Sequence, residues 1–122
     1  MVTDKLTELI IAAAIEVYRI LSPGLLESIY EEALCHELAL RRLLVKRQAE
    51  IDVTYKGKVI KGQRIDILVE DQVIVELKSL SSLPEVALAQ TLSYLKATDL
   101  KRSLLINFGE KRLVDGIKSI SL

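Results

Sequence analysis

The sequence predicts an α/β fold, with helices flanking a central mixed β-sheet and elements in the order ααβββαββ. Two observations carry this prediction. Apolar residues recur at three- and four-residue spacing up to about residue 43, and they alternate with polar residues from residue 49 onward. Turn-forming residues separate the segments. A sheet covered by helices buries both kinds of apolar face.

The first part of the chain predicts two helices. The first is capped by Thr3 and extends to about Leu21, where Ser22-Pro23-Gly24 interrupts it. The second covers about residues 25–43. Each carries one apolar stripe: Leu6, Leu9, Ile10, Ala13, Ala14, Val17 and Leu21 on the first, and Leu26, Ile29, Tyr30, Ala33, Leu34 and Leu38 on the second.

Two strands follow, over residues 49–55 and 58–69. The first alternates apolar and charged or polar residues, as a half-buried strand does. Lys56-Gly57-Lys58 predicts the hairpin turn between them. Gly62 predicts a bulge in the second strand.

The last third of the chain predicts one helix and two strands. Ser82 and Glu85 have the spacing of a capping box, and Pro84 suits the first turn of the helix. A strand over residues 104–106 follows that helix. The last strand is expected within residues 113–120.

Composition excludes several classes of protein. The 122 residues suit one domain, residues 1–122, and a hydrophobic content of 50% excludes a disordered chain. The single cysteine, Cys35, excludes a disulfide framework and a cysteine-rich zinc site. The longest apolar run, residues 9–15, is too short to span a bilayer, and no secretion signal is evident, so a cytoplasmic protein without a membrane partner is expected.

The net charge of zero conceals an asymmetry. Residues 1–40 contain seven acidic and two basic residues, whereas residues 41–122 contain ten acidic and fifteen basic residues. The balance excludes a polycation that binds nucleic acid by bulk charge alone. The basic clusters are either solvated surface or one face that tolerates phosphates.

The most informative segment is a predicted hairpin within residues 64–78. A three-residue loop at positions 70–72 would place Val69 opposite Val73, and therefore Asp66 opposite Glu76. Lys78 lies two residues beyond Glu76 on the same face of the strand.

Two carboxylates and one ammonium group would then converge at one end of an apolar sheet. A divalent cation relieves the repulsion between two carboxylates, and a nearby lysine offsets developing negative charge. This arrangement suits metal-assisted hydrolysis of a phosphodiester. A structural ion pair of Lys78 with Glu76 or Asp66 is the alternative that spacing alone leaves open.

These residues resemble the PD-(D/E)XK nuclease motif, in which an acidic residue and a hairpin precede E-x-K on the next strand. Here the motif is Asp66 followed by Glu76-Leu77-Lys78, with Ile65 in place of the proline. Gln90-Thr91-Leu92-Ser93-Tyr94 is similar to the Q-x-x-x-Y signature on the following helix. Gly24-Leu25-Leu26-Glu27-Ser28-Ile29-Tyr30 fits G-x-x-E-x-x-Y, so the sequence resembles the GxxExxY protein family of that superfamily over nearly its whole length.

The resemblance implies a restriction-endonuclease-like core and a nuclease that uses Mg²⁺, for which Mn²⁺ substitutes. The implied metal ligands are Asp66, Glu76, the carbonyl of Leu77, and Glu27 as a third acidic ligand or a group that positions water. The other implied roles are Lys78 orienting the attacking water, Gln90 supporting the site, Tyr94 positioning Lys78 or substrate, and Tyr30 and Arg64 contacting substrate. Ala87 stands where relatives often carry a histidine, which leaves the role of that histidine unfilled.

Other interpretations remain open beside this one. Glu27 can stabilise a helix N-terminus, Tyr30 and Tyr94 can be core aromatics, and Gln90 can satisfy a buried backbone group.

The expected partner is nucleic acid, DNA rather than RNA. A homodimer is a further expectation, because the apolar stripe of residues 6–21 leaves room for a dimer face. The alternatives to a nuclease are a catalytically inactive nuclease-fold module that binds nucleic acid or protein, and a structural oligomer.

Overall fold

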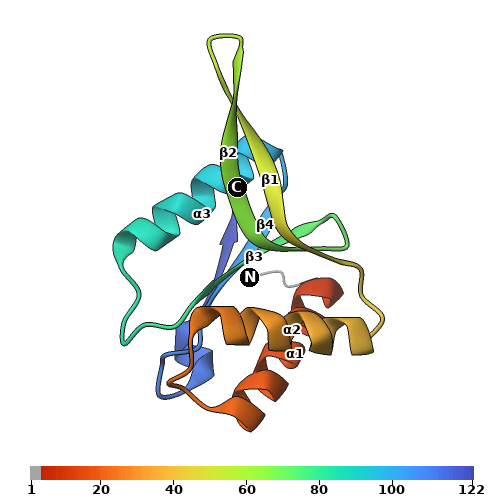
Figure 1. The fold of residues 1–122 in the computed structure, drawn as a ribbon, viewed down its shortest axis with the longest axis vertical. Helices are drawn as coiled ribbons and strands as arrows, with labels where there is room; N and C mark the ends of the chain where they lie inside the picture. The colour runs from red at the N-terminus through yellow and green to blue at the C-terminus, as the bar shows by residue number, and fades with distance from the viewer. Residues whose placement is uncertain (1–3) are drawn as a thin grey trace.

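The computed structural model describes residues 4–122, and its sheet lies between two helices on one face and one helix on the other (Figure 1). The elements are α1 (Lys5–Leu21), α2 (Glu27–Leu40), β1 (Val45–Tyr55), β2 (Lys58–Val69), β3 (Val73–Lys78), α3 (Glu85–Thr98), β4 (Arg102–Asn107), the short 3₁₀ helix η1 (Leu113–Gly116) and β5 (Ile117–Ser121). The predicted fold class and element order are confirmed. In the described part of the chain, no helix has the length and apolar character needed to cross a membrane.

The five strands form one mixed sheet in the order β1-β2-β3-β4-β5. Only β3 and β4 pair in parallel, because α3 returns the chain across one face of the sheet between them. The predicted register of the β2–β3 hairpin is confirmed, since Val69 pairs with Val73. The predicted bulge is confirmed as well: the β1–β2 register shifts beside Gly62, whose φ is 114°.

Two hydrophobic clusters hold the layers together. The larger lies between the sheet and the α1–α2 pair, and it includes Ile10, Leu34 and Phe108. The smaller lies between the sheet and α3, where Tyr94 and Leu95 are buried. The apolar stripe of α1 is part of the larger cluster, so its buried residues are not available as a dimer face.

The helix boundaries differ from the predictions where caps were inferred. Asp4 caps α1, with its Oδ1 accepting a hydrogen bond from the Thr7 N–H at 2.7 Å; Thr3, the predicted cap, lies outside the described residues. The predicted capping box at Ser82 is wrong, because Pro84 is the N-cap of α3 and makes no side-chain hydrogen bond there. The second helix begins at Glu27 and ends at Leu40, shorter than predicted.

The apolar stripes are also narrower than predicted. Leu26 and Ile29 are exposed because α2 turns a different face to the core, and Leu9 of α1 lies at the margin of its stripe. The outer halves of β1 and β2 project beyond the body of the molecule, at the top of Figure 1. Val53 and Tyr55 are therefore exposed, although strict alternation predicted a buried face there.

Candidate functional site

Strands β2 and β3 separate at Asp66 and Glu76, and their side chains replace the backbone ladder. The last backbone pair on this side is Ile67 with Val75. Beyond it, the Asp66 N–H donates to Glu76 Oε1 at 2.8 Å, and the Leu77 N–H donates to Asp66 Oδ2 at 2.9 Å. The two carboxylates are thus held at the point where the strands diverge, as the predicted register required.

The partner strand on the other side of β2 is also irregular at this point. In the β1–β2 register, Gln48 lies opposite Asp66, but the pairing passes from Arg47–Ile67 to Ala49–Ile65 without it. Gln48 has a φ of 50°, in the left-handed region that a glutamine rarely adopts. Backbone strain of this kind persists where surrounding contacts hold it, and it is concentrated at functional sites.

Alternation along β2 breaks at the same residue. Ile65 packs in the cluster beneath α3, whereas Ile67 packs in the cluster beneath α1 and α2. Two residues apart on a regular strand would share one face. Asp66 therefore lies at a twist of the strand between the two layers, where a side chain is accessible from the divergence of β2 and β3.

Glu76 is the most perturbed acid of the site. Its side chain is buried, with 6% of the residue exposed. Burial, followed by the charge of Asp66 and a hydrogen bond with it, raises the pKa of Glu76 to about 8, although the Asp66 N–H and Lys78 act in the opposite direction. A buried carboxyl group in this state gains from a cation that stabilises its ionised form.

Lys78 is half-buried at the end of β3. It is close enough to lower the pKa of both Glu76 and Glu27, but in the described part of the chain its ammonium makes no ion pair. The structural ion pair that spacing left open therefore does not form. The ammonium group stays available for a water molecule or an anion.

Glu27 lies in the first turn of α2 and faces the same site. Partial burial raises its pKa; the nearby Lys78 lowers it, and the charges of Asp66 and Glu31 raise it. However, among residues 4–122 no three histidine, cysteine, aspartate or glutamate side chains form a cluster suited to a metal ion. The described residues therefore hold no preformed three-residue metal cluster that includes Glu27, and its role as a third ligand stays a prediction.

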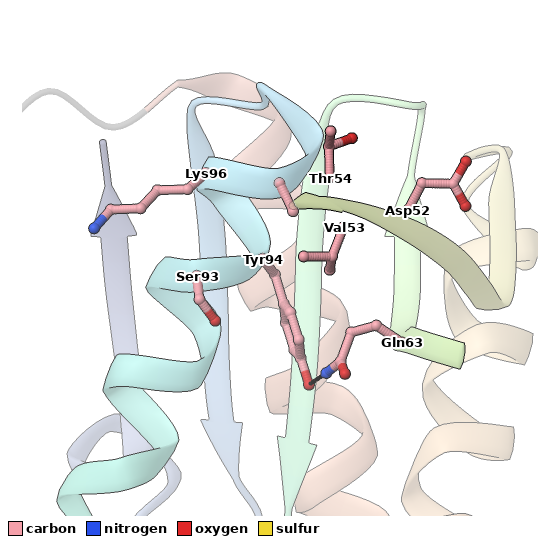
Figure 2. Close-up of a pocket in the computed structure, with 8 residues that line it drawn as sticks. Asp52, Val53, Thr54, Gln63, Ser93, Tyr94 and Lys96 are labelled. Atoms are coloured by element: carbon pink, nitrogen blue, oxygen red, sulfur yellow. Dashed lines mark hydrogen bonds between the residues drawn. The ribbon is translucent and has the colours of Figure 1, made fainter. Parts of the chain in front are cut away.

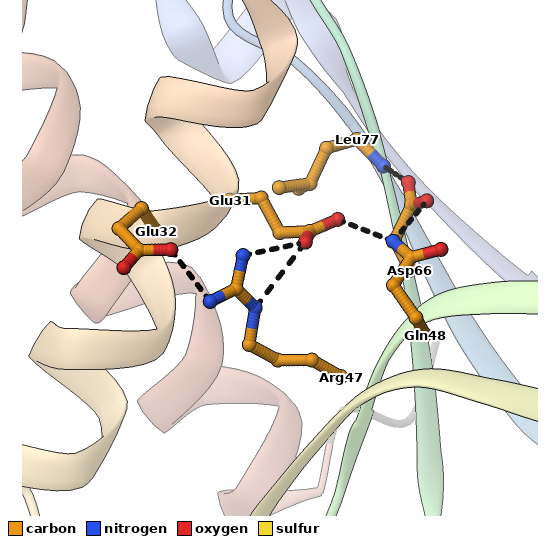
Figure 3. A network of polar contacts seen from close by, with 6 residues as sticks. All are labelled: Glu31, Glu32, Arg47, Gln48, Asp66 and Leu77. Carbon is orange, nitrogen blue, oxygen red and sulfur yellow. Dashed lines mark hydrogen bonds and ion pairs between the residues drawn. The ribbon is translucent and has the colours of Figure 1, made fainter.

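A polar network connects Asp66 to α2 (Figure 3). Gln48 Nε2 donates to Glu31 Oε1 at 2.8 Å and reaches Asp66 Oδ1 at 3.5 Å. The Arg47 guanidinium donates twice to Glu31 Oε2, at 2.9 and 3.2 Å, and also binds Glu32. Arg47 thereby neutralises Glu31, which is almost fully buried.

Glu31 and Gln48 contact the site but were not among the site residues predicted from the sequence. A signal for Glu31 was present, since it lies four residues after Glu27 and therefore on the same helical face. No comparable signal marks Gln48, whose position depends on its unusual backbone conformation.

Tyr94 lies on α3, and its ring points toward Gln63 of β2 (Figure 2). Its hydroxyl accepts a hydrogen bond from Gln63 Nε2 at 2.8 Å. Burial raises the pKa of Tyr94, and the charges of Glu76 and Asp66 raise it further, whereas the hydrogen bond from Gln63 lowers it. Gln90, the other member of the helical signature, is exposed, and within residues 4–122 its side-chain amide makes no hydrogen bond.

Tyr30 belongs to the core and not to the surface of the site. It is fully buried, and its ring stacks on Phe108 with centroids 4.5 Å apart. Its hydroxyl donates to the Ser22 carbonyl at 2.5 Å and accepts from the Leu25 N–H at 3.1 Å. Tyr30 thus fixes the loop that precedes Glu27, and the substrate contact implied for it stays a prediction.

Arg64 is exposed on β2, opposite Glu50 of β1. No described contact joins it to the carboxylates of the site. Its predicted role in binding substrate stays a prediction.

Asn107 fixes the chain that follows Lys78. Its Oδ1 accepts from the Leu80 and Gly109 N–H groups at 2.9 and 3.0 Å, and its Nδ2 donates to the Leu80 carbonyl at 2.9 Å. A Cβ on Gly109 would lie 2.1 Å from the Leu80 carbonyl oxygen, so only glycine permits this approach. The segment after β4 therefore sets the path of the loop that leaves the site.

Comparison with known proteins gives one match. A family model described as the PD-(D/E)XK nuclease superfamily matches residues 4–120. No curated protein and no solved structure matches the chain.

Proposed function

Since the chain belongs to the PD-(D/E)XK nuclease superfamily, we propose that it is a metal-dependent nuclease that hydrolyses phosphodiester bonds of nucleic acid. The observation that carries this proposal is the cross-strand link between Asp66 and Glu76, with Lys78 two residues further along β3. The G-x-x-E-x-x-Y motif around Glu27 further supports placement in the GxxExxY family.

The donor set at this position suits a hard divalent cation. Asp66 and Glu76 would hold the ion, with the carbonyl of Leu77 as a further oxygen ligand, and Mg²⁺ is the proposed metal with Mn²⁺ as a substitute. The raised pKa of Glu76 supports the assignment, because a cation offsets the cost of ionising a buried carboxyl group. When bound, the metal supplies an acidified water and stabilises the negative charge that develops on the phosphate.

The side chains around the carboxylates have distinct proposed roles. Lys78, which makes no ion pair in the described residues, holds the attacking water and offsets negative charge. Glu27 faces Lys78 and positions water instead of completing a preformed metal cluster. Tyr94 positions Lys78 or the substrate, and Gln90 and Arg64 contact the nucleic acid from the rim. We propose DNA as the substrate in preference to RNA.

The direct test is cleavage of labelled DNA and RNA by the purified chain in Mg²⁺, Mn²⁺ or EDTA. The parent is expected to cleave only with metal, and Lys78→Ala is expected to lower the rate by about 10²–10³-fold, the loss typical of one electrostatic stabiliser. Lys118→Ala, an exposed lysine on β5, is the matched control. Cleavage by Lys78→Ala at the parent rate would exclude the assigned site.

A second candidate function is a catalytically inactive module that retains the nuclease fold and binds nucleic acid or protein. The observation that favours it is the lack of a three-residue metal cluster among residues 4–122. Calorimetric titration with Mg²⁺ and Mn²⁺ separates the two functions. Binding that is lost in Asp66→Asn supports the nuclease, whereas nucleic-acid binding without any metal binding supports the inactive module.

A further inference from the structure

The ribbon formed by residues 52–63, the outer parts of β1 and β2, projects beyond α3 (Figure 1). Residues 53–62 contain three lysines and no acidic residue. Within residues 4–122, Lys61 is the one lysine of the ribbon that forms an ion pair, with Asp52 at 2.8 Å. The tip of the ribbon therefore carries positive charge on a segment that contributes little to the core.

One face of this ribbon combines apolar side chains with cations. Val53 pairs with Ile60, and Tyr55 pairs with Lys58, so these four side chains lie on the same face. That face continues the one through which Ile51 packs toward α3, yet Val53, Tyr55 and Ile60 are exposed, with Tyr55 at 61%. The Lys56 ammonium lies 5.6 Å from the centroid of the Tyr55 ring.

A cavity at the base of the ribbon connects this face to the candidate site. It has a volume of about 510 Å³ and lies between the ribbon and α3. Val53, Gln63 and Tyr94 line it, and the hydrogen-bonded Gln63 amide and Tyr94 phenol are directed toward each other across it (Figure 2). Tyr94 packs in the same small cluster as Ile65 of β2 and Ile74 of β3, which lie within two residues of Asp66 and Glu76, so the cavity opens on the side of the sheet beneath α3.

We propose that a single strand of nucleic acid lies along this face of the ribbon and enters the cavity beside Tyr94, with bases against Tyr55, Val53 and Ile60 and phosphates at Lys56 and Lys58. The proposal rests on the proposed function and specifies how that site takes its substrate. An exposed aromatic ring among cations is the arrangement that binds single strands, since bases stack on the ring and phosphates bind the cations.

The charge of the ribbon argues for this occupant over a second copy of the chain. Two such ribbons would bring together lysines of like charge with few acids to offset them. The apolar side chains argue for a single strand over a duplex, because a duplex keeps its base faces stacked and inaccessible. Both other occupants are outcomes of the experiment below.

The experiment measures binding of a fluorescent 20-nucleotide single strand and of the corresponding duplex by anisotropy, in EDTA to prevent cleavage. The double variant Lys56→Glu/Lys58→Glu is expected to weaken single-strand binding at least 10-fold and to reduce its salt dependence. Tyr55→Ala is expected to weaken it about 5-fold, while Tyr55→Phe retains it. Lys118→Glu, on the far edge strand β5, is the matched control and is expected to stay within 2-fold of the parent.

Several results would overturn the proposal. The ribbon would not be the binding site if its variants bound the single strand as tightly as the parent, or if Lys118→Glu lost as much affinity as they did. Tighter binding of the duplex than of the single strand would exclude a single strand as the occupant. Sedimentation of a parent dimer that Tyr55→Ala converts to a monomer would make the ribbon a contact between copies. Cleavage assays separate this proposal from the proposed nuclease function. If the parent binds single strands through the ribbon but never cleaves them, strand binding on the ribbon is supported and the nuclease function is rejected. If the parent cleaves but the ribbon variants bind normally, only strand binding on the ribbon is rejected.

Discussion

Gln48 lies opposite Asp66 across the β1–β2 pair, and its amide lies between the Asp66 carboxylate and Glu31 of α2. The contact joins the acid at the strand divergence to the helix that also carries Glu27. Side chains that hold a metal-binding carboxylate orient it and tune its affinity. Gln48 is therefore expected to act on the site through Asp66.

Two variants of Gln48 separate its side chain from its backbone. Gln48→Ala and Gln48→Gly both remove the amide, and both are expected to weaken Mn²⁺ binding about 10-fold. Alanine at position 48 retains a Cβ, which is disfavoured in the left-handed backbone conformation of this residue, whereas glycine has none. Gln48→Ala is therefore expected to be about 1 kcal/mol less stable to urea than Gln48→Gly. The exposed Gln72→Ala serves as the control, and parent-like Mn²⁺ affinity in both Gln48 variants would show that the amide does not orient Asp66.

The stability of the metal-free protein is expected to fall as pH rises from about 5 to 8. Burial raises the pKa of Glu76 to about 8 in the folded chain, against an ordinary value of 4.5. Between these values the folded chain holds a proton that the unfolded chain has released, so the contribution is complete below pH 4.5 and is lost as pH passes 8. Urea denaturation at several pH values in EDTA measures this decrease.

Glu76→Gln removes the titrating group and should flatten this dependence, while Glu85→Gln, at an exposed position, should preserve it. Mn²⁺ at pH 8 should restore stability to the parent, since the cation binds the ionised folded form. A pH dependence that survives in Glu76→Gln would assign it to another group.

The hairpin could be predicted from sequence because its determinants are local. A three-residue turn at positions 70–72 places Val69 opposite Val73 and, by counting back along the strands, Asp66 opposite Glu76; the structure keeps this register as far as Ile67 and Val75. Gly62 signalled the bulge for the same reason, since a glycine inside a strand pattern marks a local departure from the ladder. The relative positions of the motif residues on this hairpin therefore depend on interactions between residues that are near one another in sequence.

The surroundings of the hairpin could not be predicted in the same way. The G-x-x-E-x-x-Y spacing does not separate Glu27, which faces the site, from Tyr30, which packs on Phe108, because both occupy the start of one helix. That distinction depends on which face α2 turns to the sheet. The Arg47–Glu31–Gln48 network depends on contacts between elements far apart in sequence and on a left-handed residue in β1.

Asn107→Ala is expected to destabilise the fold by about 2–3 kcal/mol. The substitution removes three hydrogen bonds from a fully buried side chain and leaves the Leu80 N–H and carbonyl without that partner. Gly109→Ala is expected to be at least as damaging, because its Cβ would overlap the Leu80 backbone. Urea denaturation measures the stability of both variants, with the exposed Ser119→Ala as control. Ordinary surface substitutions change stability by up to about 0.5 kcal/mol. A change of that size in both variants would show that the contacts of Asn107 and Gly109 with Leu80 do not stabilise the fold.

Removal of the Tyr30 hydroxyl is expected to affect mainly stability, whereas removal of the Tyr94 hydroxyl is expected to affect mainly the cleavage rate. Tyr30→Phe keeps the stack on Phe108 but loses the bonds to Ser22 and Leu25, so it should lower stability by about 1–2 kcal/mol and leave the cleavage rate per folded molecule unchanged. Tyr94→Phe loses one bond to Gln63 at the edge of the cavity, so its effect on stability should be smaller. Its cleavage rate should fall about 10-fold or more, as expected for a group that positions Lys78 or substrate.

Urea denaturation and Mn²⁺-dependent cleavage of the same preparations measure the two effects independently. A rate loss in Tyr30→Phe with none in Tyr94→Phe would reverse the assignment of the two aromatics to core and site.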